Sequence, residues 1–199
     1  MELDGLKIGY CVTGSFCTFH KMIEAVKELK ALGADIYPVM SEISYNTDTR
    51  FGTADEFKSQ LQEITGHTII KSVQEAEPIG PKKMFDLVIV APCTGNTIAK
   101  IANGITDTSV TMAVKAHIRN SRPVLIGVST NDALGNSARN IGCLFNLKNL
   151  YFVPFNQDDF INKPNSLVAD FKRIPEAAIS ALKGIQLQPL ILSSAVVDK

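Results

Sequence analysis

Four polar segments interrupt the apolar runs of this sequence, and each directly follows a run that resembles a buried strand. Their residues are small and bear hydroxyl or amide groups, and hardly any is charged: Thr13-Gly14-Ser15, Ser41, residues 92–97 (PCTGNT) and Ser129-Thr130-Asn131. Such groups donate and accept hydrogen bonds but do not form an acid–base pair. The chemistry they predict is therefore the binding of a planar polar ring or of phosphate oxygens.

The first segment has the features of a phosphate site. Gly14 allows a tight turn and a close approach to a ligand, and Ser15 opens the helix expected next. The N–H groups at a helix start attract anions. Ser15 has an alternative interpretation as a simple N-cap. The sequence contains neither GxGxxG nor GxxxxGK[ST]. In the third segment, capping by Thr94 or Asn96 would explain one polar residue but not the cluster.

These segments require a parallel sheet to bring them together. Buried apolar runs predict strands at 6–12, 35–40, 86–91, 123–128 and 150–153, with a further short strand at 67–70. Helices are predicted at 16–32, 53–65 (a capping box at its start), 96–103, 107–120 (Asp107 as N-cap), 133–146 and 167–183, the last bent or restarted near Pro175. Polar loops are predicted at 43–53 and 155–165. This alternation predicts a doubly wound parallel α/β sheet in three layers, α/β/α. Ligands of such sheets bind beyond the carboxyl ends of the strands.

Length and composition set the broad class. The 199 residues predict a single domain, 1–199, ending in a tail from 184 to 199. The formal net charge of zero argues against a nucleic-acid partner. The sequence has neither a signal-peptide pattern nor a run long enough to span a membrane, so we expect a cytoplasmic protein. The four cysteines, at 11, 17, 93 and 143, form no metal-ligand spacing, which predicts reduced thiols and no metal site.

Several segments carry a family resemblance. Residues 91–107 (APCTGNTIAKIANGITD) resemble the PASANTIAKIANGIADN signature of the homo-oligomeric flavin-containing cysteine decarboxylases. That superfamily includes phosphopantothenoylcysteine decarboxylase, lantibiotic-modifying enzymes and, more distantly, prenylated-flavin synthases. Residues 9–17 (GYCVTGSFC) resemble its first turn, GxTGSxxA. Within the superfamily, residues 39–43, 127–142 and 153–170 resemble the B subunits of bacterial dipicolinate synthases, and this similarity covers nearly the whole chain.

The resemblance implies a flavodoxin-like fold with FMN as the ligand. The phosphate end would lie against Gly14, Ser15 and Phe16, helped by Ser41. The flavin or its ribityl chain would face the segment that holds Pro92, Thr94, Gly95, Asn96 and Thr97, and the next strand would close the site with Ser129, Thr130 and Asn131.

The departures from the decarboxylases concern catalysis. Their substrate-binding PAMNxxM stretch corresponds to residues 128–134 (VSTNDAL), where only Asn131 matches. His67 is the nearest candidate for their catalytic histidine, while His20 and His117 are expected to carry no chemistry. Cys93 stands where the signature has alanine, and is either a thiol facing the substrate or a small packing residue. Catalytic residues therefore stay unassigned.

The resemblance implies an oxidoreductase subunit that is active with a separate A subunit. The A subunit would bind NAD(P), and the pair would convert a dihydrodipicolinate-type precursor to dipicolinate, pyridine-2,6-dicarboxylate, during sporulation. A dianionic product calls for cations. Of the arginines 50, 119, 122 and 139, Arg139 is chosen as the substrate ligand, with a solvated helix face as its alternative role.

Two other functions stay open. One is a stand-alone flavin-dependent decarboxylase or flavin prenyltransferase. The other is a non-catalytic partner subunit with a vestigial nucleotide pocket. The resemblance also implies a homo-oligomer, a trimer or a dodecamer, with the 155–165 loop and the apolar tail at 190–197 (LILSSAVV) as expected contact surfaces.

Overall fold

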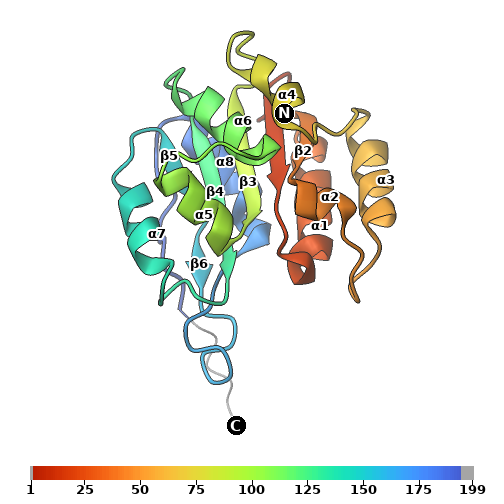
Figure 1. The fold of residues 1–199 in the computed structure, drawn as a ribbon. Helices are drawn as coiled ribbons and strands as arrows, with labels where there is room; N and C mark the ends of the chain where they lie inside the picture. The colour runs from red at the N-terminus through yellow and green to blue at the C-terminus, as the bar shows by residue number, and fades with distance from the viewer. Residues whose placement is uncertain (1, 194–199) are drawn as a thin grey trace.

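The computed structural model describes residues 2–193, and a parallel sheet forms its centre (Figure 1). Five strands lie in the order β2-β1-β3-β4-β5, and each pairs in parallel with its neighbours: β1 (Lys7–Val12), β2 (Asp35–Met40), β3 (Leu87–Cys93), β4 (Val124–Thr130) and β5 (Leu150–Phe152). This is the strand order of flavodoxin-like folds. The predicted fold class is confirmed.

Helices cover both faces of the sheet, as its apolar strands require. All seven residues of β3 are buried, which is expected of a central strand with helices on either side. One core lies beneath α1 (Phe19–Ala31) and α8 (Ile174–Leu182), with α3 (Ala54–Thr65) packed on α1. The other lies beneath α5 (Gly95–Ala102), α6 (Ser109–Ile118) and α7 (Ala138–Phe145). The remaining short helices are η1 (Phe16–Thr18), α2 (Glu42–Asn46), α4 (Val73–Ala76), η2 (Glu77–Ile79) and η3 (Phe171–Arg173).

The sheet continues beyond the predicted unit with two antiparallel strands. β7 (Leu167–Ala169) pairs with the end of β4, where Ser129 faces Val168, and β6 (Phe155–Asn156) pairs with β7. The predicted helix over 167–183 is therefore wrong at its start, whereas its predicted restart near Pro175 is confirmed. The helix begins only at Ile174, where Pro175 occupies the first turn and needs no N–H partner.

Four other predicted elements differ from the structure. Helix α6 begins at Ser109 with Thr108 as its N-cap, so the assignment of Asp107 to that role is wrong. Helix α7 begins at Ala138 because the preceding turn folds around Asp132, whose Oδ1 lies 3.0 Å from Ser137 Oγ. The predicted strand at 67–70 contributes only one bridge to β2. The predicted loop at 43–53 contains α2, whereas the capping box at residue 53 is confirmed.

Part of the predicted tail is packed against the sheet. The side chain of Gln186 accepts a hydrogen bond from Phe152 N and donates one to Phe152 O, both 2.8 Å long. Ile191 forms a bridge beside Phe155. Residues 194–199, which include half of the predicted contact surface in the tail, lie outside the described residues. Between residues 2 and 193, no helix is both long enough and apolar enough to cross a membrane.

The packing of β1 leads to a prediction about stability. A Cβ at Gly9 would lie 2.5 Å from Cδ2 of the fully buried Phe85 ring, whereas a Cβ at Gly142, within α7, would meet nothing within 4 Å. We expect Gly9→Ala to lower the free energy of unfolding by about 1–3 kcal/mol through overpacking. Gly142→Ala, the control, is expected to raise it by about 0.5–1 kcal/mol. Urea unfolding followed by circular dichroism measures both, and equal stabilities would contradict this packing.

Candidate functional site

Thr13 ties together the loops that follow β1 and β3. Its buried hydroxyl donates to Pro92 O at 2.7 Å and accepts a hydrogen bond from Thr94 N at 3.1 Å. From β1 the chain continues to β2 on one side, and from β3 it continues to β4 on the other. This change of direction is the switch point at which open α/β sheets bind ligands. Thr13 therefore fixes the floor of the predicted site.

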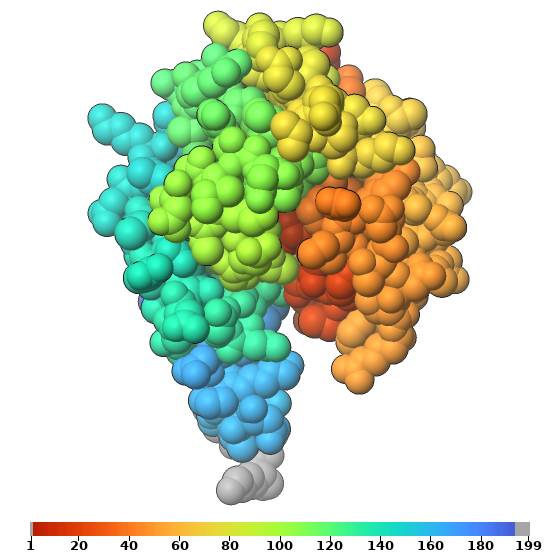
Figure 2. Space-filling model, in the orientation of Figure 1, coloured from red at the N-terminus to blue at the C-terminus, as the bar shows by residue number. Residues whose placement is uncertain are grey.

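Two adjoining hollows lie at this edge of the sheet. The first, here called the α5 hollow, has a volume of about 390 Å³ and lies between α2 and the start of α5. The second, the loop hollow, has a volume of about 570 Å³, and Gly14 and Thr94 line both. Figure 2 shows the molecule hollowed here, between the orange segment before α3 and the blue segment after β6. Each volume is in the range of small-molecule sites.

The α5 hollow offers hydrogen bonds from the start of a helix. Thr94 caps α5 by accepting a hydrogen bond from Thr97 N at 3.4 Å. The first N–H groups of a helix lack partners within the helix, so they favour an anion or a polar ring nearby. Lys100 also lines the hollow, and its Nζ lies 2.8 Å from both carboxylate oxygens of Asp107. The hydrogen bond from Lys100 lowers the pKa of the Asp107 carboxyl, so this pair is charged but internally balanced.

Ser15 does not cap the helix that follows it. Its hydroxyl lies 2.7 Å from Ser129 Oγ and makes no capping hydrogen bond, so the simple N-cap interpretation is wrong. The contact between the two hydroxyls bridges the ends of β1 and β4, the two strands that flank β3. Both serines line the loop hollow. They form a polar floor between segments that are 114 residues apart in the sequence.

The loop hollow is more highly charged than the sequence suggested. Two loops form its walls, one with Arg50 and Phe51 and the other with Asp158 and Lys163. Lys21, from α1, also lines it. These cations are the functional candidates that sequence reasoning missed. Arg50 is one of the four arginines named from the sequence as possible substrate ligands, but no feature of the sequence around it indicates that its loop faces the loop that holds Lys163.

Ten of the twelve predicted cofactor-binding residues line these two hollows: Gly14, Ser15, Phe16, Ser41, Thr94, Asn96, Thr97, Ser129, Thr130 and Asn131. Pro92 is buried behind them and receives the hydrogen bond from Thr13. Gly95 also lies behind them, because a Cβ there would be 2.7 Å from Ser137 Oγ and 2.9 Å from Thr130 Oγ1. Glycine at 95 thus lets α5 approach the turn after β4.

The three other predicted residues lie apart from the hollows. His67 Nε2 is 2.7 Å from Oδ1 of Asp35, the first residue of β2, which places it at the amino end of the sheet. Cys93 is fully buried in the core, and burial raises the pKa of its thiol. Arg139 is exposed on α7 and is not among the residues that line either hollow.

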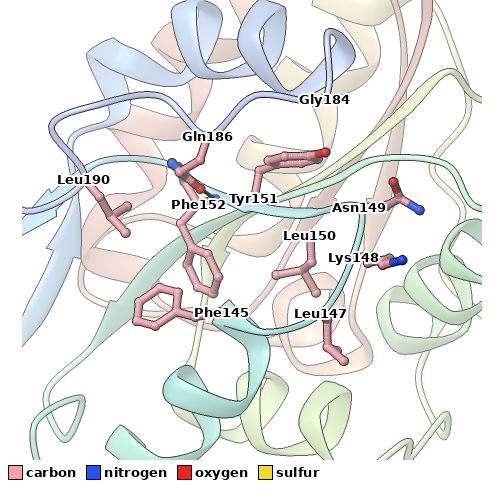
Figure 3. A pocket seen from close by; sticks show the side chains of 10 residues that line it. All are labelled: Phe145, Leu147, Lys148, Asn149, Leu150, Tyr151, Phe152, Gly184, Gln186 and Leu190. Carbon is pink, nitrogen blue, oxygen red and sulfur yellow. Dashed lines mark hydrogen bonds between the residues drawn. The ribbon is translucent and has the colours of Figure 1, made fainter.

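A separate hollow of about 510 Å³ lies along β5, between the end of α7 and the start of the tail (Figure 3). Its walls include Phe145, Tyr151 and Gln186. The amide of Gln186 is already bonded to the backbone of Phe152, and Lys148 is the one cation among its lining residues. It therefore lacks the group of convergent donors found at the switch point.

Comparisons with known proteins agree with this geometry. The family model described as Flavoprotein matches residues 1–152, and the chain belongs to the Flavoprotein family. Over 193 residues it is 44% identical to the B subunit of dipicolinate synthase from Bacillus subtilis (strain 168), a match that covers 97% of this chain and 96% of that protein. The crystal structure of the B subunit of dipicolinate synthase from Bacillus halodurans C is similar, with a TM-score of 0.90 and 43% identity, covering 98% of this chain and 100% of that one.

A more distant solved structure shares the fold. The structure of Burkholderia xenovorans DmrB in complex with FMN has a TM-score of 0.61 and 23% identity, and covers 74% of this chain and 87% of that one. At this identity the likeness shows the fold alone.

Proposed function

We propose that this chain is the B subunit of a dipicolinate synthase and that it holds FMN at the switch point between β1 and β3. The proposal rests on one combined observation: two hollows lined by hydroxyl and amide groups meet at the switch point of a chain that is similar over 97% of its length to a protein of that name. The reaction would convert a dihydrodipicolinate-type precursor to pyridine-2,6-dicarboxylate.

The lining residues suit FMN. Gly14 lines both hollows. A Cβ at this position would come within 3.2 Å of Ile43 Cγ2, so glycine keeps this narrow space open for a ligand. We assign the phosphate end to Gly14, Ser15 and Phe16, with Ser41 beside them. The flavin and its ribityl chain would lie against the Thr94–Thr97 segment and be closed in by Ser129, Thr130 and Asn131. Hydroxyls, amides and helix N–H groups are the donors that phosphate and a polar ring require.

The roles of the chain's own residues are binding and orientation. Conversion of a dihydro ring to an aromatic pyridine removes two electrons and two protons, and bound FMN supplies a two-electron acceptor. Of the three carboxylates that line the hollows, Asp107 and Asp158 are each held by a lysine, and Glu42 is exposed in the first turn of α2. We assign the shaping of the flavin site to this chain. NAD(P) is assigned to the A subunit, as the family resemblance implies.

Reconstitution tests this function. The A subunit, this chain, and the two together are each incubated with the precursor, with and without FMN, and dipicolinate is measured. We expect product at the full rate only from the pair with FMN. Product from this chain alone would instead indicate a self-sufficient flavin enzyme. A rate that depends on this chain but not on FMN would indicate a partner with a vestigial pocket. A homo-oligomer, as a trimer or dodecamer, stays a prediction.

A further inference from the structure

The loop hollow carries an excess of positive charge on its walls, beside the floor to which we assign the FMN phosphate. Lys21, Arg50 and Lys163 line it, and Asp158 is the one acidic residue among its lining residues. In the α5 hollow, by contrast, Lys100 is paired with Asp107, and Glu42 adds a negative charge. A hollow with three cations and one carboxylate favours anions.

Arg50 is held in place without being neutralised. Within residues 2–193, none of the ion pairs involves Arg50. Its guanidinium carbon lies 4.9 Å from the centre of the Phe51 ring, and Phe51 is half-buried and lines the same hollow. Contact with an aromatic face orients a guanidinium while its N–H groups stay free. Arg50 is therefore prepared to bind a carboxylate.

Lys163 is positioned by its own loop. Its Nζ lies 3.3 Å from Asp158 Oδ2, and Ser166 donates a hydrogen bond to the other oxygen of that carboxylate. Burial acts to raise the pKa of Asp158, but the hydrogen bonds from Ser166 and Lys163 outweigh it and lower that pKa. The backbone bond from Lys163 N to Asp159 O, 2.8 Å long, closes the loop. An ammonium group has three donors, so Lys163 keeps donors for a ligand.

From this placement we propose that Arg50 and Lys163 form the substrate subsite of the chain, each binding one carboxylate of a small planar dicarboxylate. The inference rests on the proposed function for the identity of the substrate. The two cations belong to different walls of the loop hollow, and its floor carries the hydroxyls of Ser15 and Ser129. Arg139, the sequence-based choice, lines neither hollow.

Calorimetric titration with dipicolinate tests the subsite on both the FMN-loaded and the FMN-free chain. We expect Arg50→Gln and Lys163→Gln each to weaken dipicolinate binding about tenfold, and the double variant about 100-fold, because each removes one charge-assisted contact. FMN affinity should be unchanged in all three variants; a parallel loss of FMN affinity would assign these cations to the phosphate and overturn the subsite. Lys82→Gln, which removes an exposed cation outside both hollows, is the control and should bind dipicolinate as the wild type does.

A second readout uses the chain's own thiols. Cys17 and Cys143 are both exposed, but Cys17 lines the loop hollow and Cys143 lies on α7. Dipicolinate should slow alkylation of Cys17 severalfold, leave Cys143 unaffected, and lose this effect in the double variant.

The subsite is overturned if both variants bind dipicolinate like the wild type, or if Arg139→Gln has the larger effect. It is also overturned if wild-type protein shows neither heat nor Cys17 protection with dipicolinate. These outcomes are separate from the failure of the proposed function. If the wild type binds no FMN, the flavin role falls, whereas titration of the FMN-free chain still decides the subsite.

Discussion

Replacing Ser15 with glutamate is expected to weaken FMN binding at least ~100-fold, which corresponds to about 3 kcal/mol. The serine hydroxyl is half-buried and lies 2.7 Å from Ser129 Oγ, so a longer side chain must displace that contact or enter the loop hollow. The new carboxylate would also place a negative charge where we assign the phosphate. Like charges brought together in a partly desolvated site cost several kcal/mol. Titration of FMN, followed by the quenching of its fluorescence, measures the effect.

Two variants separate charge from other causes. Ser15→Ala removes only the hydroxyl pair and should weaken FMN binding severalfold, in keeping with about 1 kcal/mol for one hydrogen bond. Ser59→Glu adds the same charge at an exposed position of α3 and should leave FMN binding unchanged. If Ser15→Glu binds FMN normally while its unfolding midpoint matches that of the wild type, the phosphate does not lie at the turn after β1.

The elements that local sequence determines were predicted well. A buried parallel strand is a continuous apolar run, so β3 and β4 are visible without knowledge of their neighbours. The polar segments that follow them were identified by the same reasoning, because the carboxyl ends of parallel strands share one edge. The floor of the site, including the Thr13 and Thr94 contact, therefore follows from strand prediction together with the position of the switch point.

The features that were missed depend on contacts between distant segments. β7 is a strand because Leu167 and Val168 pair with the end of β4, and the isolated segment reads equally well as the start of a helix. The pairing of Ser15 with Ser129 likewise joins residues from opposite halves of the chain. Arg50 and Lys163 of the loop hollow come from two polar loops whose sequences give no sign that they face each other.

His67 shows the same limit for a single side chain. It lies in the segment that follows β2 along the chain, which makes it the nearest candidate for the catalytic histidine. The chain returns, however, to the amino end of β2, where His67 is stacked on Tyr37 with ring centres 3.9 Å apart. The position of a residue after a strand in the sequence does not reveal which end of that strand its loop approaches.

His117 is expected to make the fold sensitive to mild acid. Its side chain is 2% exposed, and its Nε2 has no partner among the described residues. Burial lowers the pKa of this imidazole from 6.5 to about 4, and the nearby Arg122 acts in the same direction, against contributions from Asp86 and the backbone of Pro123. Between these two pKa values the unfolded chain binds a proton that the folded chain does not. The contribution of His117 to stability is therefore present above pH 6.5 and is lost as the pH falls toward 4.

The expected loss between pH 7 and pH 5 is roughly 2 kcal/mol from this one group. Urea unfolding at the two pH values measures it in the wild type, which also carries the contributions of its carboxylates. His117→Gln keeps those contributions but removes the imidazole, so its free energy of unfolding should fall by about 2 kcal/mol less over the same interval. His20→Gln removes an exposed histidine from α1 and should retain the wild-type pH dependence. Equal losses in the wild type and His117→Gln would mean that this imidazole meets solvent or a hydrogen-bond acceptor before the fold opens.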